Sequence, residues 1–356
     1  MTSVAPVVVT RVEGGVGRVT LNRPEAINAL TGEMVGLIAS ALEAWATDGA
    51  VATVLLDGAG DRGFCAGGDV VALADSMARG DGRAEAFWRA EYRLNAAIAR
   101  YPKPVVALMD GLVLGGGVGL ACHASHRIVT ERSRVGLPET GIGFLPDVGA
   151  TWLLARAPGQ LGLFAALTNR FLTGAEAIHL GLADVLVGSV TADELAAALR
   201  DASPDEVIRD AAHPVPVPEL AGRRDVLDEA LAGDDLAVML ARLDAGDEEA
   251  RDAAATIRTK SPTASAVTVA AIRSAARAGR LEDALVTELR AAVRLAAAPD
   301  FAEGVRAQLI DKDRRPRWSP ASVDELRADE LAPYLAPLDH DLGFDHDPTI
   351  DRKGDS

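Results

Sequence analysis

The sequence predicts an α/β protein with a helical C-terminal region. Over roughly the first 190 residues, short apolar runs of strand length alternate with amphipathic helical stretches, which is typical of a largely parallel sheet covered by helices. Hydrophobic residues make up 49% of the chain and aromatic residues only 4%, so Ala, Val and Leu must supply most of the core. A chain of 356 residues is long enough for one large domain and a smaller one.

The elements of the α/β part follow in order. Val7–Val12 and Val16–Asn22 flank Gly14 and Gly15 and predict a β-hairpin. Thr31 is a candidate N-cap, because apolar residues recur behind it at helical spacing. Further strands are expected at 53–57, 105–109, 127–130 and 184–187, and helices at 69–79, 83–100, around Trp152 and Phe164, and at 175–181.

Four regions are expected along the chain. Residues 1–200 form the α/β core, and 201–218, rich in Pro and Asp, are expected to be a linker. Residues 219–325 carry an almost purely helical pattern. Residues 326–356 form an acidic tail whose end lacks periodicity, so it is expected to be mobile.

Charge and cysteine content exclude several classes of function. The 36 basic and 52 acidic residues give a net charge of −16, which repels nucleic acid and anionic membranes. Cys65 and Cys122 form no metal-ligand spacing, and the N-terminus lacks a basic segment followed by an apolar one. We therefore expect a cytoplasmic protein that binds neither nucleic acid nor membrane.

Two glycine loops each join a predicted strand to a predicted helix. Gly67 and Gly68 lie in the first, and Gly115 to Gly119 form the second. Glycine lets a backbone N–H approach a ligand closely, and such turns aim free N–H groups at one spot. Two converging turns would make an oxyanion hole. Helix packing or phosphate binding would also explain them, although neither loop fits a Walker or GxGxxG motif.

The motifs LNRPEAINAL, GFCAGGDV, PVVALMDGLVLGGGVGLACHASHRIVT and LPETGIGFLPDVGA, in this order, resemble the enoyl-CoA hydratase/isomerase (crotonase) superfamily. More narrowly, AEYRLN, TGAEAIHLGLADVLV, SPTA and GVRAQLIDKDRRPRW resemble the 3-hydroxyisobutyryl-CoA hydrolases of valine degradation. The resemblance covers most of the chain and implies a crotonase-like (ββα)n spiral core. It also implies an acyl-CoA substrate, so that coenzyme A belongs to the substrate and no separate cofactor is needed. Members of this superfamily form trimers or hexamers, so the resemblance implies a homo-oligomer.

The same resemblance assigns roles to individual residues. It implies that the amides of Gly68 and Gly116 form the oxyanion hole and that the carbonyl of Ala66 meets the adenine. Arg23 and Arg62 are candidates by position for the phosphates of coenzyme A, although surface arginines are usually only solvated.

Acidic residues near the oxyanion hole decide the chemistry in this superfamily. The resemblance implies that a hydratase of this superfamily uses two glutamates. One of them lies three residues past the glycine that corresponds to Gly116, where this chain has Gly119. The other position is Glu139, and Asp147 follows eight residues later. The hydrolase resemblance assigns Glu139 and Asp147 to catalysis and substrate binding, and Glu91 to the substrate. Two close carboxylates can differ in pKa, so that one acts as base and the other as donor.

Each of these side chains also has an ordinary structural explanation. Asp147 could be the N-cap of the helix after it, Glu139 a solvated loop acid and Glu91 an exposed helix acid. Asp69 is expected to be a helix cap. His123 and His126 lack a third metal ligand, so no metal site is expected, and Cys65 lacks a histidine partner that would make it a nucleophile.

We therefore expect hydrolysis of the thioester of 3-hydroxyisobutyryl-CoA or a similar short 3-hydroxyacyl-CoA. The alternative is an enoyl-CoA hydratase or isomerase that uses Glu139 and Asp147, although Gly119 argues against a hydratase. A third hypothesis is a non-catalytic relative that binds coenzyme A or RNA; the retained pair of acids and the negative charge argue against it.

Overall fold

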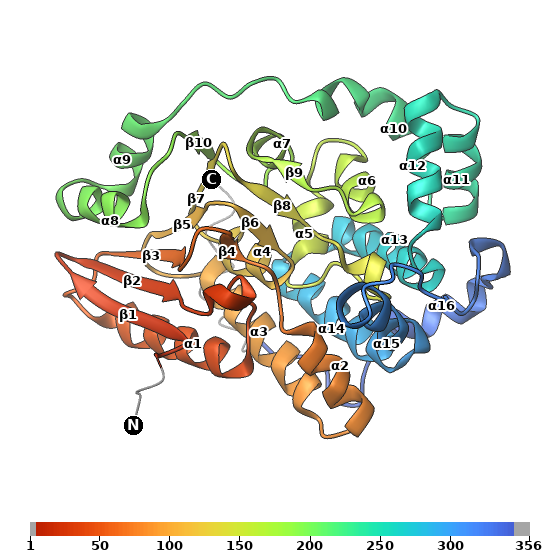
Figure 1. The fold of residues 1–356 in the computed structure, drawn as a ribbon, viewed down its shortest axis with the longest axis horizontal. Coiled ribbons are helices and arrows are strands. Elements are labelled where there is room, and N and C mark those ends of the chain that lie inside the picture. Colours follow the sequence, from red (N-terminus) through yellow and green to blue (C-terminus); the bar gives the residue numbers. More distant parts are fainter. Residues whose placement is uncertain (1–4, 345–356) are drawn as a thin grey trace.

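The computed structural model describes residues 5–344 and contains two β-sheets (Figure 1). The larger sheet has the strand order β1-β2-β3-β5-β7-β10, in which only β1 and β2 are antiparallel. The smaller sheet has the order β4-β6-β8-β9, in which only β8 and β9 are antiparallel. The strands are β1 (Val8–Glu13), β2 (Val16–Leu21), β3 (Thr53–Gly58), β4 (Gly63–Cys65), β5 (Val105–Met109), β6 (Leu112–Leu114), β7 (His126–Thr130), β8 (Arg134–Gly136), β9 (Leu172–Thr173) and β10 (Val185–Val187).

The two sheets are built by a repeating unit of two strands followed by a helix. Strands β3, β5 and β7 enter the larger sheet, and the strand that follows each of them, β4, β6 or β8, enters the smaller one. A helix follows each pair, which confirms the expected (ββα)n core. Because the helices that begin at Val70 and Gly116 closely follow β4 and β6, the two glycine loops leave neighbouring strands of that sheet.

Local sequence explains the elements at the start of the chain. Gly14 and Gly15 form the turn of the β1–β2 hairpin with positive φ angles of 56° and 85°. The Thr31 hydroxyl accepts a hydrogen bond from the amide of Met34 at 3.3 Å, so Thr31 is the expected N-cap of α1 (Gly32–Thr47). Both predictions are confirmed.

The helices that cover the sheets and continue beyond them follow the predicted pattern closely. In the first 190 residues they are α2 (Val70–Arg79), α3 (Arg83–Ala99), α4 (Gly116–Ala121), α5 (Ala150–Leu154), α6 (Leu161–Thr168) and α7 (Gly174–His179). The later ones are α8 (Ala192–Asp201), α9 (Pro204–Ala211), α10 (Arg224–Ala230), α11 (Leu236–Asp244), α12 (Glu248–Arg258), α13 (Pro262–Arg277), α14 (Leu281–Ala297), α15 (Pro299–Val305) and α16 (Ala328–Leu335).

The structure differs from the expected linker and tail. Residues 204–211 of the expected linker form α9, because Ser203 and Glu206 make a capping box and Pro204 occupies the first turn. Helix α16 lies within the expected acidic tail, and Arg290 forms an ion pair with Asp341 at 2.6 Å. Residues 345–356, the end of that tail, lie outside the described part of the chain.

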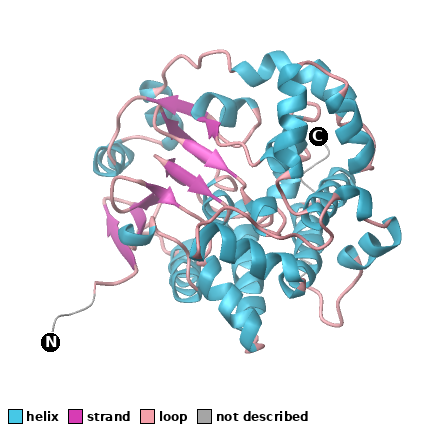
Figure 2. Cartoon of the chain, turned by 45° about the vertical axis from the view of Figure 1, so that its right-hand side comes forward, coloured by secondary structure: helices cyan, strands magenta, loops and turns pink. Residues whose placement is uncertain are grey.

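The C-terminal helices share one hydrophobic core with the α/β part. The same cluster of buried side chains includes Leu30 and Val113 of the first part and Val267, Leu285 and Phe301 of the second. Helices α13 and α14 pack against α5, and α14 also packs against α3. Figure 2 shows the strands gathered on one side of the molecule and most of the helices on the other. Within residues 5–344, no helix combines the length and apolar character that a membrane crossing needs.

Candidate active site

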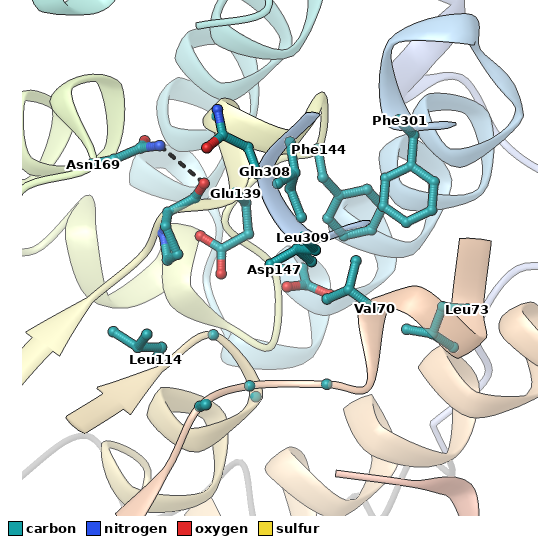
Figure 3. A pocket seen from close by; sticks show the side chains of 18 of the residues that line it. Val70, Leu73, Leu114, Glu139, Phe144, Asp147, Asn169, Phe301, Gln308 and Leu309 are labelled. Carbon is teal, nitrogen blue, oxygen red and sulfur yellow. Dashed lines mark hydrogen bonds between the residues drawn. The ribbon is translucent and has the colours of Figure 1, made fainter. Parts of the chain in front are cut away.

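A cavity of about 420 Å³ lies between the two glycine loops and the C-terminal helices (Figure 3). The loops supply Ala66, Gly67, Gly68, Gly115 and Gly116 to its wall. The remaining wall combines apolar side chains with a few polar ones: Val70, Leu73, Phe87, Trp88, Glu91, Leu114, Pro138, Glu139, Gly141, Ile142, Phe144, Asp147, Asn169, Lys260, Phe301, Gln308 and Leu309. Such a largely apolar cavity with convergent polar groups is typical of a small-molecule site.

The glycine loops approach each other at the cavity. A Cβ added to Gly116 would lie 3.4 Å from the amide nitrogen of Gly68. It would also lie 2.5 Å from Oε1 of Glu91, so no side chain fits at Gly116 unless Glu91 moves. Within residues 5–344, the amides of Gly68 and Gly116 donate to no protein acceptor. The structure thus brings together two unpaired N–H groups on one wall of the cavity, the arrangement that an oxyanion hole needs.

Three carboxyl groups face this cavity from three different elements. Glu91 comes from α3, Glu139 from the 3-10 turn Glu139–Ile142, and Asp147 from the loop before α5. They are only 2%, 6% and 6% exposed, so the explanations of Glu139 as a solvated acid and of Glu91 as an exposed one are wrong. Figure 3 shows the carboxyl groups of Glu139 and Asp147 directed into the same space.

Burial gives these carboxyl groups unusual titration behaviour. Loss of solvation raises the pKa of Glu139 well above its ordinary value, and the neighbouring charges of Asp147 and Glu288 raise it further. Burial likewise raises the pKa of Glu91, with Asp147 and Glu139 adding to the effect. For Asp147 burial raises the pKa to about 7, although a hydrogen bond from Tyr92 opposes the rise. Clustered carboxyls of this kind can hold and release protons near neutral pH.

Asp147 is not the N-cap of α5. Its Oδ2 accepts a hydrogen bond from the Tyr92 hydroxyl at 2.6 Å. The N-cap of α5 is Gly149, and the amides of Gly149 and Thr151 donate instead to the carboxylate of Glu288. Asp147 is therefore free to face the cavity.

The space beside Gly119 is already filled. A Cβ there would lie 2.6 Å from Cβ of Val148 and 2.8 Å from Nδ2 of Asn95. Val148 itself has a positive φ of 58°, which is rare for a β-branched residue. A glutamate at position 119 would require this packing to move. The chain therefore lacks the glutamate that the resemblance to hydratases implies at this position, and the structure leaves no space for its side chain.

The two candidate phosphate-binding arginines do not line the cavity. Arg23 donates to the carbonyl of Ala29 at 2.6 Å and pairs with Asp69 at 3.2 Å. Arg62 donates to the carbonyls of Pro24 and Glu25. Asp69 also accepts from the amide of Ala72, as expected for the cap of α2. Both guanidinium groups thus have partners within the protein and lie outside the cavity wall.

His123 and Cys65 are buried, and each contacts a backbone carbonyl. His123 contacts the carbonyl of Val148 at 2.8 Å, and burial lowers the pKa of His123 to about 4. The ring nitrogens of His126 contact Ser125 and Asp205, not His123. Burial raises the pKa of the Cys65 thiol to about 12, which disfavours a thiolate. In the described residues, no three His, Cys, Asp or Glu side chains converge as metal ligands would.

Several residues of the site are absent from the sequence-based predictions. The cavity is also lined by Asn169, Lys260 and Gln308. Tyr92 donates a hydrogen bond to Asp147, and Glu288 accepts one from Gly149 in the same loop. One signal was available for Glu288: it interrupts the apolar stripe Leu281, Leu285, Leu289, Ala292 and Leu295 of α14. Lys260 gave no such signal, because it precedes α13 in a connecting segment.

Comparisons with known proteins agree with this architecture. Residues 16–335 match the family described as enoyl-CoA hydratase/isomerase. The chain is 37% identical over 324 residues to the mitochondrial 3-hydroxyisobutyryl-CoA hydrolase of Danio rerio, covering 87% of this chain and 84% of the relative. It is 33% identical to the human protein of that name, covering 96% and 92%.

Two solved structures are also similar over nearly the whole chain. A carnitinyl-CoA dehydratase from Mycobacterium thermoresistibile is 46% identical, with a TM-score of 0.92 and coverage of 96% of this chain and 99% of that one. An enoyl-CoA hydratase from Rhodobacter sphaeroides 2.4.1 is 43% identical, with a TM-score of 0.88 and coverage of 95% and 100%. The chain therefore belongs to the enoyl-CoA hydratase/isomerase family and has the crotonase fold.

Proposed function

We propose that this protein hydrolyses the thioester of a short 3-hydroxyacyl-CoA, with 3-hydroxyisobutyryl-CoA as the preferred substrate. One observation carries the proposal: position 119 has no carboxylate and no room for one, while Glu139 and Asp147 remain in the cavity with the free amides. The relatives named 3-hydroxyisobutyryl-CoA hydrolase support the choice of substrate.

In the proposed reaction the thioester carbonyl oxygen accepts hydrogen bonds from the amides of Gly68 and Gly116. These donors stabilise the charge that develops on that oxygen, by about 3 kcal/mol each. Glu139 then either removes a proton from water as the water attacks the carbonyl carbon, or attacks that carbon itself to give a mixed anhydride that water opens. The carbon–sulfur bond breaks in both routes, and the thiolate of coenzyme A takes up a proton.

The other two carboxyl groups have different roles in this proposal. Oδ2 of Asp147 already accepts from Tyr92, which leaves Oδ1 to accept a hydrogen bond from the 3-hydroxyl group. Glu91, with its pKa raised by burial and by both neighbouring acids, holds a proton beside Gly116 and can assist proton transfer to the departing thiolate.

A lyase that adds or removes water is the second candidate. The names of the two solved structures that are 43–46% identical support it. Three buried carboxyl groups could supply an acid and a base even without a glutamate at position 119.

One assay separates the two candidates. The wild-type protein is incubated with a panel of short acyl-CoAs, and free thiol and enoyl-thioester absorbance are followed together. We expect thiol release from 3-hydroxyisobutyryl-CoA and no change in enoyl absorbance with crotonyl-CoA. Absence of thiol release from every 3-hydroxyacyl-CoA, with hydration of crotonyl-CoA, would establish the lyase instead.

The two hydrolytic routes differ in where the oxygen of water goes. In a single turnover in labelled water, the anhydride route puts label into the carboxyl group of Glu139 when water attacks the glutamyl carbon of the anhydride, and the general-base route does not. Mass analysis of the peptide that contains Glu139 distinguishes them.

A further inference from the structure

A buried carboxylate on α14 holds the loop that carries Asp147. Glu288 is 0% exposed, although it lies more than 130 residues from that loop in the sequence. Its Oε2 accepts a hydrogen bond from the amide of Gly149 at 2.6 Å. Its Oε1 accepts from the amide of Thr151 at 2.9 Å and from the Thr151 hydroxyl at 2.5 Å. All three donors belong to the loop that carries Asp147.

The loop is fixed on both sides of this contact. Tyr92 of α3 donates to Asp147, and His123 contacts the carbonyl of Val148 at 2.8 Å. That carbonyl can only accept, so Nε2 of His123 carries the proton. Between these contacts, Val148 and Gly149 both have positive φ angles, 58° and 79°. A β-branched residue in this conformation is strained and persists only where its surroundings hold it.

From these contacts we infer that Glu288 is a positioning residue: it holds the loop 147–151 in the conformation that directs Asp147 into the cavity. The inference rests on the proposed function, in which Asp147 binds the substrate. Glu288 is not among the residues that line the cavity, and its hydrogen bonds connect it to the site through Gly149 and Thr151 of this loop. Through Glu288 the C-terminal helices contribute to the site, because α14 belongs to the region beyond the α/β core.

The contact needs an acceptor at both side-chain oxygens of Glu288. Burial raises the pKa of Glu288 to about 8, while the hydrogen bonds from Thr151 and Gly149 oppose the rise. A glutamine has one acceptor oxygen and presents an NH₂ group to its remaining partners, which are backbone donors and one hydroxyl. At least one amide of the loop would then lack an acceptor, and the strained Val148 would be free to relax.

The test compares Glu288→Gln with Glu282→Gln, a matched change on the same helix. Glu282 is equally buried but pairs with Arg100, away from the cavity. We expect Glu288→Gln to lower kcat by about 10- to 100-fold, as a misplacement of about 1 Å can, with KM changed much less. Glu282→Gln should keep the wild-type kcat. A wild-type kcat in Glu288→Gln would overturn the inference.

Hydrogen exchange of the ligand-free protein gives a second readout that does not depend on turnover. The amides of Gly149 and Thr151 should exchange faster in Glu288→Gln than in Glu282→Gln or wild type. Unchanged protection at both amides would contradict the inference even if activity fell. Because no substrate is present, this result stands apart from whether the protein is a hydrolase.

If Glu288→Gln does not fold, Thr151 provides a milder test. Thr151→Val removes one of the three hydrogen bonds to Glu288 at nearly constant volume, whereas Thr151→Ser keeps the hydroxyl. We expect kcat to fall more in Thr151→Val than in Thr151→Ser. Equal kcat values in the two variants would overturn the inference.

Discussion

Gly116 shows most directly how single residues shape this site. Gly116 lines the cavity, and a methyl group on its Cα would lie 2.5 Å from Oε1 of Glu91. Contacts under about 3 Å force one partner to move, so a side chain at Gly116 displaces either the amide or Glu91. Glycine is thus required here for close approach.

Gly116→Ala should lower kcat by roughly 100-fold, because one oxyanion-hole donor is displaced. The matched control is Gly36→Ala, an exposed position in α1 where an added Cβ meets nothing within 4 Å. Steady-state thiol-release kinetics of the two variants give the comparison. Near-wild-type kcat in Gly116→Ala would count against an oxyanion hole at this amide.

Tyr92 offers a test of the carboxyl pair through pH. The activity of the wild type should rise as pH increases through about 7, because Asp147 ionises there and the pKa of Glu139 is also raised. Tyr92→Phe removes a hydrogen bond that lowers the pKa of Asp147. The acidic limb of the kcat/KM profile should therefore move to higher pH. A limb that stays in place, or moves to lower pH, would contradict this role.

Sequence reasoning reached Glu139, Asp147 and Glu91 through motif resemblance and spacing. It could not show that Glu91 is buried, because that depends on which face of α3 meets the second glycine loop. Arg23 and Arg62 were candidates by position alone; both donate to local carbonyls, Arg23 also pairs with Asp69, and their role toward coenzyme A stays a prediction.

At the scale of elements, the small sheet was the part that sequence patterns missed. Its strands β4, β6, β8 and β9 have two or three residues each, too few for an alternating pattern to stand out. The longer strands of the large sheet were predicted within one or two residues. The glycine loops are nevertheless positioned by the small sheet, so the local signal was weakest where the site is built.

Helix α4 and the Asp147 loop pack together at Gly119. Gly119→Ala places Cβ 2.6 Å from Cβ of Val148, so one of the two buried segments must shift. We expect a loss of about 1–3 kcal/mol in the free energy of unfolding. Denaturant titration beside Gly32→Ala, an open exposed position, measures it. Stability equal to that of the control would show that the contact is looser than described.

At the scale of the whole molecule, one core joins the α/β part and the C-terminal helices, and four of the buried acids lie at or beside the candidate site. Glu91, Glu139 and Asp147 come from the first region and Glu288 from the second. The helical composition of the second region was readable from the sequence. Its contact with the site was not, because packing between distant segments leaves no local pattern.

These acids make stability depend on pH in a predictable direction. A carboxyl whose pKa is raised on folding favours the folded state below its ordinary pKa and loses that contribution as pH rises through the raised value. For Asp147 this window runs from 3.8 to about 7. Through Asp147, thermal stability should therefore fall as the pH rises from about 4 to about 7.

Asp147→Asn should weaken that dependence. At about pH 8 the variant avoids a buried charge and should melt at a higher temperature than wild type, while at about pH 5 the two should differ little. Calorimetry at both pH values tests this, with exposed Asp201→Asn as the control. A lower melting temperature for Asp147→Asn at the higher pH would show that the charge is stabilising.

The most direct test of the proposed function is the rate of thiol release from 3-hydroxyisobutyryl-CoA by wild type and by Glu139→Gln. Loss of the buried base should reduce kcat by about 100-fold or more. The exposed variant Glu131→Gln should keep the wild-type rate. A wild type that releases thiol while Glu139→Gln releases it equally fast would contradict a hydrolase that works through Glu139.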